Sequence, residues 1–421
     1  MPALRRIPPA ALYLLLNAAT AFTFAVMFTS TMLYYITVIR LDPFQLVLVG
    51  TALEVAIFLF EIPTGIVADL YSRRLSIIIG KIVIGLGYVQ MVLIPTAAAV
   101  YIGQIIWGFG YTFTSGATDA WIADEIGEER AAGLYLRSSQ FGAAAGIAGI
   151  VVGIILGSLQ LVLPIFVGAI LSILLGIFLA LSMTENGYTP KPRTGRGLFA
   201  PLTNMRGTLR DGVLAVRARP VLITILLITV VHGAFSEGFD RLWQKHIIDT
   251  VGFPETPTLQ PVAWFGLHAI AASLIGIGAA EWTRRRVNTA HHRAVARALL
   301  ITSGFLSAAV IGFAFVGNWW AAALITLAIS ALRTVHDPLT TAWINQSLDS
   351  NSRATVLSMN GQADAFGEMA VGPGVGAFAA RFSVRAALVL AGFLLLPALG
   401  LYGRSLQEGQ EGQSQKTGNA L

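Results

Sequence analysis

The sequence predicts an all-α membrane protein with twelve transmembrane helices in two six-helix, pseudo-symmetric bundles. Three observations favour this fold class: the composition, the number of long apolar stretches and an internal repeat. Of the 421 residues, 55% are hydrophobic and only 12% are charged, whereas a soluble domain carries about 25% charged residues. The chain therefore belongs in a lipid bilayer. The absence of cysteine excludes disulfides, thiolate nucleophiles and cysteine-ligated metals.

Twelve apolar stretches are each long enough to cross about 30 Å of hydrocarbon, which takes about 20 residues of α-helix. These predicted spans lie at about 10–36, 44–68, 75–95, 98–122, 133–157, 160–183, 220–247, 259–280, 295–316, 318–343, 354–380 and 383–403. The first stretch follows Arg5 and Arg6, as the apolar part of a signal peptide does. We reject cleavage because removal of this span would leave an odd number and spoil the pairing of the two halves.

One long polar stretch, rich in glycine, proline and arginine, divides the chain nearly in half. We therefore expect an N-terminal six-helix bundle at 1–183, a basic cytoplasmic linker at 184–219 and a C-terminal six-helix bundle at 220–403. The tail at 404–421 is rich in glutamine and glycine, which predicts a disordered cytoplasmic segment.

The two halves repeat two short motifs. Ala68–Arg74 returns as Ala280–Arg286, and Ala120-Trp121-Ile122 returns as Ala342-Trp343-Ile344. Parallel repeats in a membrane protein place a substrate path at the repeat interface.

Positive charge fixes the expected orientation. With both termini in the cytoplasm, most lysine and arginine residues fall on the cytoplasmic side, and few remain outside, chiefly Arg40, Lys245, Arg381 and Arg385. This distribution follows the positive-inside rule and favours a multi-pass protein of the bacterial inner membrane. The net charge of +6 then reflects membrane topology, not nucleic-acid binding. We expect a monomer in the lipid bilayer.

The segment Gly65-Ile66-Val67-Ala68-Asp69-Leu70-Tyr71-Ser72-Arg73-Arg74 resembles the signature loop between the second and third helices of the major facilitator superfamily. The resemblance covers the whole chain, with a degenerate second copy at Glu281–Arg286. Ser72 occupies a usual glycine position, and Gln104 stands where many exporters of the family carry a buried arginine. The resemblance implies a secondary transporter without cofactor or metal. It is greatest to the drug/proton antiporter branch, which covers multidrug, macrolide and tetracycline efflux.

A cytoplasmic gate is expected at this loop and its second copy. A carboxylate one helical turn from two guanidinium groups can lock neighbouring helices in one state and release them in another. The expected gate residues are Gly65, Asp69, Arg73, Arg74, Asp124, Glu281 and Arg285, with Asp69 next to Arg73 and with Asp124 or Glu125 at the end of the fourth span. The alternative is a set of solvated charges at the membrane surface.

Acidic residues inside the predicted spans are candidates for proton or cation binding. Glu54 lies in the second span, and Asp364 and Glu368 lie one turn apart in the eleventh. An ionised side chain at the bilayer centre costs about 3 kcal/mol, so such acids should face a cavity or a partner. The alternative is a neutral, hydrogen-bonded structural carboxyl group.

Other residues of the spans complete this expected cavity. His268 is either a proton relay or a hydrogen-bonded core residue. Aromatic side chains near the acids are expected to line a permissive pocket, among them Phe58, Trp107 and Tyr111. Lys81 lies about two turns into the third span, from where we expect its ammonium group to reach the cytoplasmic surface.

Two further groups of charges are predicted to be separate. In the outer cluster, Glu237 and Arg241 are four residues apart and can pair on one helix face, which leaves Asp240 for another group. In the inner pair, Arg333 and Asp337 repeat this spacing near the inner end of the tenth span, where Arg333 could contact an anion.

Three functions compete. The first is proton-coupled efflux of amphipathic or cationic compounds. The second is proton symport that imports a small nutrient or anion, which Arg333 or Arg241 would recognise. The third is a membrane enzyme or a scaffold without transport. No catalytic triad, HExxH motif or nucleotide-binding loop occurs in the sequence, so we do not expect an enzyme.

Overall fold

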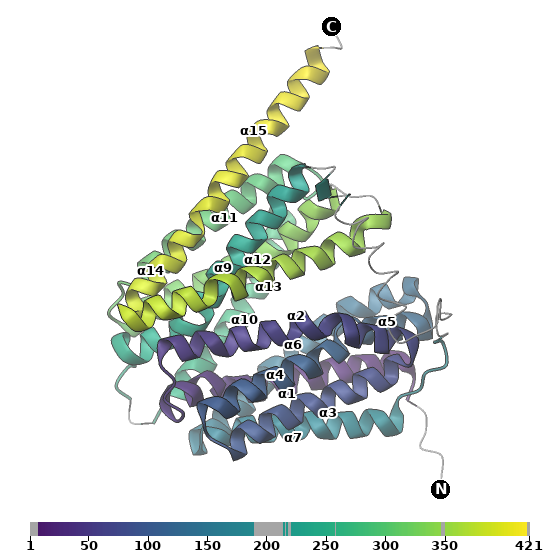
Figure 1. The fold of residues 1–421 in the computed structure, drawn as a ribbon, viewed down its shortest axis with the longest axis vertical. Helices are drawn as coiled ribbons and strands as arrows, with labels where there is room; N and C mark the ends of the chain where they lie inside the picture. The colour runs from purple at the N-terminus through teal and green to yellow at the C-terminus, as the bar shows by residue number, and fades with distance from the viewer. Residues whose placement is uncertain are drawn as a thin grey trace. The chain divides into compact units, whose positions relative to one another are not determined.

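The computed structural model of the chain describes residues 7–188, 214, 216–217, 220–256, 258–346 and 350–418, with the backbone alone at 350–355 and 408–418. Within these residues the structure consists of helices joined by short turns, and they include no β-strand (Figure 1). Most of the predicted linker at 184–219 lies outside the described residues, as do residues 419–421.

Seven helices precede the linker. They are α1 (Pro9–Thr37), α2 (Pro43–Leu70), α3 (Arg73–Leu93), α4 (Ala97–Thr114), α5 (Ala117–Ile126), α6 (Glu128–Leu159) and α7 (Val162–Ser182). Polar residues start several of them. Asp42 and Gln45 form a reciprocal capping box at α2. The hydroxyls of Ser72 and Thr96 accept hydrogen bonds from backbone N–H groups at the starts of α3 and α4.

The helices after the linker begin with α9 (Pro220–His246), which continues into a π-helical segment, η1 (Ile247–Val251). The others are α10 (Pro261–Arg286), α11 (His292–Phe313), α12 (Trp319–Gln346), α13 (Ser350–Arg381), α14 (Val384–Leu394) and α15 (Leu396–Gly418). The last two helices together make one candidate span, Val384–Gln407.

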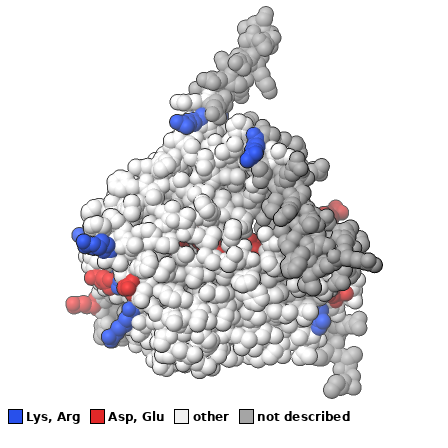
Figure 2. Space-filling view, in the orientation of Figure 1, with Lys and Arg blue, Asp and Glu red and all other residues white. Residues whose placement is uncertain are grey.

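The predicted fold class is confirmed. Ten helical segments of the described chain are long and apolar enough to cross a membrane. The remaining two predicted spans correspond to α4, which has 18 residues, and to α13, which carries Asp364 and Glu368. On the face drawn in Figure 2, most atoms belong to neither acidic nor basic residues. A surface of this kind suits contact with lipid.

Two boundaries differ from the prediction. The fourth span, predicted at 98–122, is interrupted after Thr114, and α5 starts at Ala117. Gly116 lies between them with a φ of 69°, a conformation that glycine adopts without steric cost. α15 extends beyond Arg404 as far as Gly418, and the predicted disorder of the tail stays a prediction.

The chain divides into two compact units, which we call the first and second units. The first comprises Met1–Pro201 with Thr256–Ile270, and the second comprises Leu202–Glu255 with Ala271–Leu421. In the first unit α1 packs against α6 and α7, and α3 packs against α4 and α7. In the second unit α9 packs against α13 and α14, and α11 packs against α12 and α15. The predicted bundle borders stay a prediction.

The repeated Ala-Trp-Ile motif lies in the core of each unit. Trp121 is 1% exposed and donates a hydrogen bond from Nε1 to the carbonyl oxygen of Thr184 at 2.8 Å. Trp343 is fully buried and donates from Nε1 to His292 Nδ1 at 2.7 Å. Each indole thus combines a large buried apolar surface with a satisfied N–H group. The motif therefore stabilises the core of both units.

Candidate functional site

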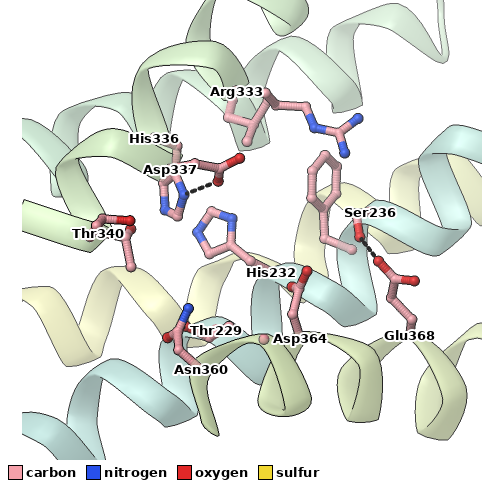
Figure 3. A pocket seen from close by; sticks show the side chains of 14 residues that line it. Thr229, His232, Ser236, Arg333, His336, Asp337, Thr340, Asn360, Asp364 and Glu368 are labelled. Carbon is pink, nitrogen blue, oxygen red and sulfur yellow. Dashed lines mark hydrogen bonds and ion pairs between the residues drawn. The ribbon is translucent and has the colours of Figure 1, made fainter. Parts of the chain in front are cut away.

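A cavity of about 250 Å³ lies inside the second unit, among α9, α11, α12 and α13 (Figure 3). Most of its lining is polar or charged, unlike the lipid-facing surface. The polar residues are Thr229, His232, Ser236, Arg333, His336, Asp337, Thr340, Thr341, Asn360, Asp364 and Glu368.

Close packing of α9 and α13 positions the two acids of α13. A Cβ atom at Gly233 would collide with the backbone of Asp364, and one at Gly367 would collide with the carbonyl oxygen of Val230. Because neither glycine has a side chain, the backbones of α9 and α13 can approach each other closely at these positions. Asp364 and Glu368 then line the same cavity, as predicted from their spacing, and Glu368 Oε1 accepts a hydrogen bond from Ser236 Oγ at 3.1 Å (Figure 3).

Arg333 binds Asp240 across two helices. Its two terminal nitrogens donate to the two carboxylate oxygens at 2.5 and 2.8 Å, and the guanidinium lies 5.8 Å from the ring centroid of Phe235. This bidentate geometry is the strong form of an arginine–carboxylate pair. Arg333 and Asp240 nevertheless stay 35% and 40% exposed, so the cavity is open to water.

The separation into an outer cluster and an inner pair is therefore wrong. The predicted pair of Glu237 and Arg241 is confirmed at 3.3 Å. Arg333, however, binds Asp240 of the outer cluster, and Asp337 lies 3.5 Å from His336 Nδ1. Because Arg333 on α12 reaches Asp240 on α9, residues assigned to different depths by counting along each helix meet in one place.

Two histidines complete the site, and the sequence did not single them out as proton carriers. The rings of His232 and His336 are stacked with centroids 3.8 Å apart. His232 Nε2 lies 3.3 Å from Ser303 Oγ, and His336 Nε2 lies 3.1 Å from the hydroxyl of Tyr402. The two imidazole rings are thus in direct contact at the wall of the cavity. The one feature of the sequence that could have indicated them is the presence of a histidine within a predicted apolar span, which holds at both positions.

Acidic groups outnumber basic groups in and around the cavity. Five carboxyl groups stand against two guanidinium groups, a net charge of −3 when all are ionised and the histidines are neutral; the acids are Glu237, Asp240, Asp337, Asp364 and Glu368. Both guanidinium groups already bind carboxylates. The described residues hold no group of three or more acids, histidines or cysteines suited to a metal ion. Acidic side chains are therefore in excess in and around this cavity.

The remaining predicted cavity residues lie outside this cavity. In the first unit, Trp107 lies 6.2 Å from Tyr111 between ring centroids, and Glu54 lies half-buried on α2. Phe58 on α2 is 43% exposed, and His268 lies half-buried on α10. Gln104 is buried and donates a hydrogen bond to the hydroxyl of Tyr35 at 2.9 Å.

Two of the predicted gate residues form an ion pair. Arg73 binds Asp124 at 2.5 Å and donates to the carbonyl oxygen of Ala120, so its guanidinium joins the start of α3 to the end of α5. Asp69 contributes its carbonyl oxygen, which accepts a hydrogen bond from the Tyr188 hydroxyl at 2.7 Å. A Cβ atom at Gly65 would meet no atom within 4 Å.

Residues 184–188 bind to this loop and to α5, and we call them the clasp. Glu185 accepts hydrogen bonds from Ser72 Oγ at 2.6 Å and from the backbone N–H of Arg74 at 3.0 Å. Glu125 accepts from the backbone N–H groups of Asn186 and Gly187. The start of the linker is thereby fixed to the loop between α2 and α3 and to α5.

Among the described residues, the ion pairs of the second copy of the loop all lie within one helix. Glu281 binds Arg284 at 2.7 Å and Arg285 at 2.6 Å, all within one helix. Both arginine side chains are more than 70% exposed, whereas that of Arg73 is 14% exposed. The two copies of the motif thus differ in their surroundings.

Comparisons with known proteins show the family. The model of the Major Facilitator Superfamily matches residues 11–361. A protein of Bacillus subtilis (strain 168), described as the uncharacterized MFS-type transporter YxaM, is 24% identical over 365 residues, which cover 85% of this chain and 86% of the relative. The chain belongs to the Major Facilitator Superfamily. It is a multi-pass membrane transporter for a small molecule, a role distinct from that of an enzyme.

Solved structures share the fold. The nucleoside transporter NupG superposes with a TM-score of 0.72 at 13% identity, over 95% of this chain and 99% of that one. The peptide transporter POT in complex with sulfate superposes with a TM-score of 0.73 at 13% identity, over 96% and 94% of the two chains. At such identities the likeness shows the fold alone.

Proposed function

We propose that the protein is a secondary active transporter that exports amphipathic or cationic small molecules in exchange for protons. The observation that carries this proposal is the excess of carboxyl groups in the cavity of the second unit. A polar cavity in a membrane-embedded unit marks a substrate or ion path, because ionisable groups in lipid are costly unless they serve one.

Competition between the proton and the cation for the same acids would couple proton movement to substrate movement. Asp364 and Glu368 attract a cation when ionised and lose this attraction when they bind protons. A ligand and a proton that exclude each other at one site shift the conformational equilibrium in opposite directions. Release of the cation outside, followed by protonation and return, would give antiport. Glu54 is the corresponding candidate in the first unit.

The two arginines favour a cation over an anion. Arg333 makes two bonds with Asp240, and Arg241 binds Glu237. An anionic substrate would have to compete with a covalently tethered carboxylate for either guanidinium. Import of an anion recognised by Arg333 or Arg241 is therefore the less supported alternative.

The loop of Asp69, Arg73 and Arg74 would act as a gate on the cytoplasmic side, with both termini in the cytoplasm of a bacterial cell. Its support is the pair of Arg73 with Asp124, which joins the start of α3 to the end of α5 and can open in another state. We propose that the transporter works as a monomer.

Transport in proteoliposomes tests the function. A panel of amphipathic cations, with ethidium and tetraphenylphosphonium as first members, is compared with uncharged compounds of similar size. An acid-inside gradient should drive uptake of cations into inverted proteoliposomes, and a protonophore should stop it. Uptake that is unaffected by the protonophore would contradict proton coupling, and transport restricted to anions would contradict the substrate class.

A further inference from the structure

The first unit buries a lysine in the membrane-spanning region. Lys81 on α3 is 5% exposed, and its ammonium group lies 5.7 Å from the ring centroid of Phe24 on α1. The expected extension of this side chain to the cytoplasmic surface is therefore wrong. The backbone of α3 is fixed at this point, because Ser172 Oγ on α7 donates a hydrogen bond to the carbonyl oxygen of Lys81 at 2.8 Å.

The ammonium group of Lys81 has no acceptor within the described chain. Its contact with the Phe24 ring is the one side-chain interaction found there, and no carboxylate acts on it. A largely buried charge without a hydrogen-bond acceptor or a counter-ion destabilises the fold. Such a group suits a ligand that supplies the missing negative charge.

A second unused donor lies beside the same phenyl ring. The indole Nε1 of Trp107 is buried and has no hydrogen-bond partner among the described residues. The Trp107 ring makes an edge contact with Phe24, with centroids 6.3 Å apart. One charged and one neutral donor thus stand next to Phe24, and both lack an acceptor.

Aromatic rings surround these donors. Phe28 and Tyr88 lie 5.7 and 6.2 Å from Trp107 between ring centroids, and Tyr111 lies at 6.2 Å. Phe28 is 41% exposed and Tyr111 is 39% exposed, so the cluster is accessible at one edge. Its rings suit a flat aromatic guest.

We propose that this cluster is a binding site for the carboxylate of a small aromatic acid. The ammonium of Lys81 and the N–H of Trp107 donate to the carboxylate oxygens, and the aromatic body of the guest packs against Phe28 and Tyr88. A cationic guest is disfavoured because the positive charge of Lys81 repels it. This binding site goes beyond the proposed function, because its carboxylate ligand is not one of the cations proposed for transport.

Calorimetric titration of the purified full chain in lipid nanodiscs tests the site without any gradient. The probes are benzoate and benzamide, which share a ring and differ in charge. Benzoate should bind about tenfold or more tightly than benzamide, because a charge-assisted hydrogen bond is stronger than a neutral one. Lys81→Met should remove this preference, and Trp107→Phe should weaken benzoate binding severalfold while the preference stays. Lys245→Met, which alters a lysine paired with Asp249 in the second unit, is the matched control and should change nothing.

Thermal unfolding of the same variants gives an independent result. Lys81→Met without ligand should melt at a higher temperature than the wild type, because an uncompensated buried charge is removed. A lower melting temperature would show that the ammonium has an acceptor in the folded chain and would overturn the proposal. Equal binding of the two probes to the wild type, no saturable benzoate binding, or an unchanged preference in Lys81→Met would overturn it as well. If Lys81→Met does not fold, unchanged benzoate affinity in Trp107→Phe overturns it.

Discussion

The two units share a repeat but differ in their interiors. Around Trp121 and Trp343 the same motif packs into a core. The cavity of the second unit is bordered by five acids, two arginines and two stacked histidines, whereas the first unit holds a cluster of aromatic rings beside a buried lysine. The repeat thus predicts shared packing but not shared chemistry. The side chains that differ between the copies are the ones to test for function.

The two copies of the signature loop show the same principle. Arg73 joins two helices through Asp124 and is mostly buried, whereas Arg285 binds Glu281 of its own helix and is 73% exposed. Among the described residues, the first copy alone has an ion pair between elements that a conformational change could break. The asymmetry predicts that mutations in the two copies have unequal effects.

The largest effect is expected from the buried pair of the second unit. Arg241→Met should lower the free energy of unfolding by about 3 kcal/mol, because Glu237, which is 2% exposed, loses its counter-charge. The double variant Arg241→Met, Glu237→Gln should recover most of this loss. Denaturant or thermal unfolding in detergent measures both. A double variant no more stable than the single one would show that the pair itself stabilises the fold.

A smaller loss is expected from the glycine contact that positions the acids. Gly367→Ala should destabilise the protein by about 2 kcal/mol, because the new methyl group meets backbone atoms of α9 that cannot move independently. Gly374→Ala on the same helix is the control, since open space surrounds that position. Size-exclusion chromatography and melting temperature check both variants, and equal behaviour would remove the argument for close α9–α13 packing.

The comparison of the two loops is sharpened by one pair of variants. Arg73→Ala should slow transport about tenfold and leave membrane insertion and ligand affinity intact, because the change acts on the gate. Arg285→Ala should transport at nearly the wild-type rate. Initial rates at matched amounts of inserted protein decide this. Wild-type transport in Arg73→Ala would show that the loop is not a gate.

The smallest effect is expected at the clasp. Glu185→Gln removes the charge that accepts hydrogen bonds from Ser72 and from the backbone of Arg74 but keeps one acceptor oxygen. We expect a severalfold change in transport rate at most, with a fall in melting temperature of a few degrees. Asp249→Asn is the control, at an ion pair of the second unit whose carboxylate side chain is 44% exposed. Equal melting temperatures for the two variants would show that the clasp is dispensable.

The sequence predicted what depends on neighbouring residues along the chain. The apolar runs gave the spans, and the four-residue spacing gave the pair of Glu237 with Arg241, because helix geometry alone decides both. The break at Gly116 was not predicted, because it depends on a positive φ that many glycines within spans do not adopt.

Contacts between helices could not be predicted in the same way. Arg333 with Asp240, the stacked histidines, and Lys81 above Phe24 each depend on the rotation of one helix relative to its neighbour. Hydropathy gives the positions of the spans but not these rotations, which packing determines. The roles of the site residues stay predictions.

Two transport assays on one variant test most directly whether the acids of α13 couple proton movement to substrate movement. Asp364→Asn and wild type are reconstituted at equal density, and pH-driven uphill uptake of an amphipathic cation is measured beside counterflow exchange of the same compound. The proposed mechanism predicts that Asp364→Asn, alone or with Glu368→Gln, loses uphill uptake and its pH dependence but retains exchange, because exchange requires no net proton movement. Uphill uptake with unchanged pH dependence in the double variant would contradict it.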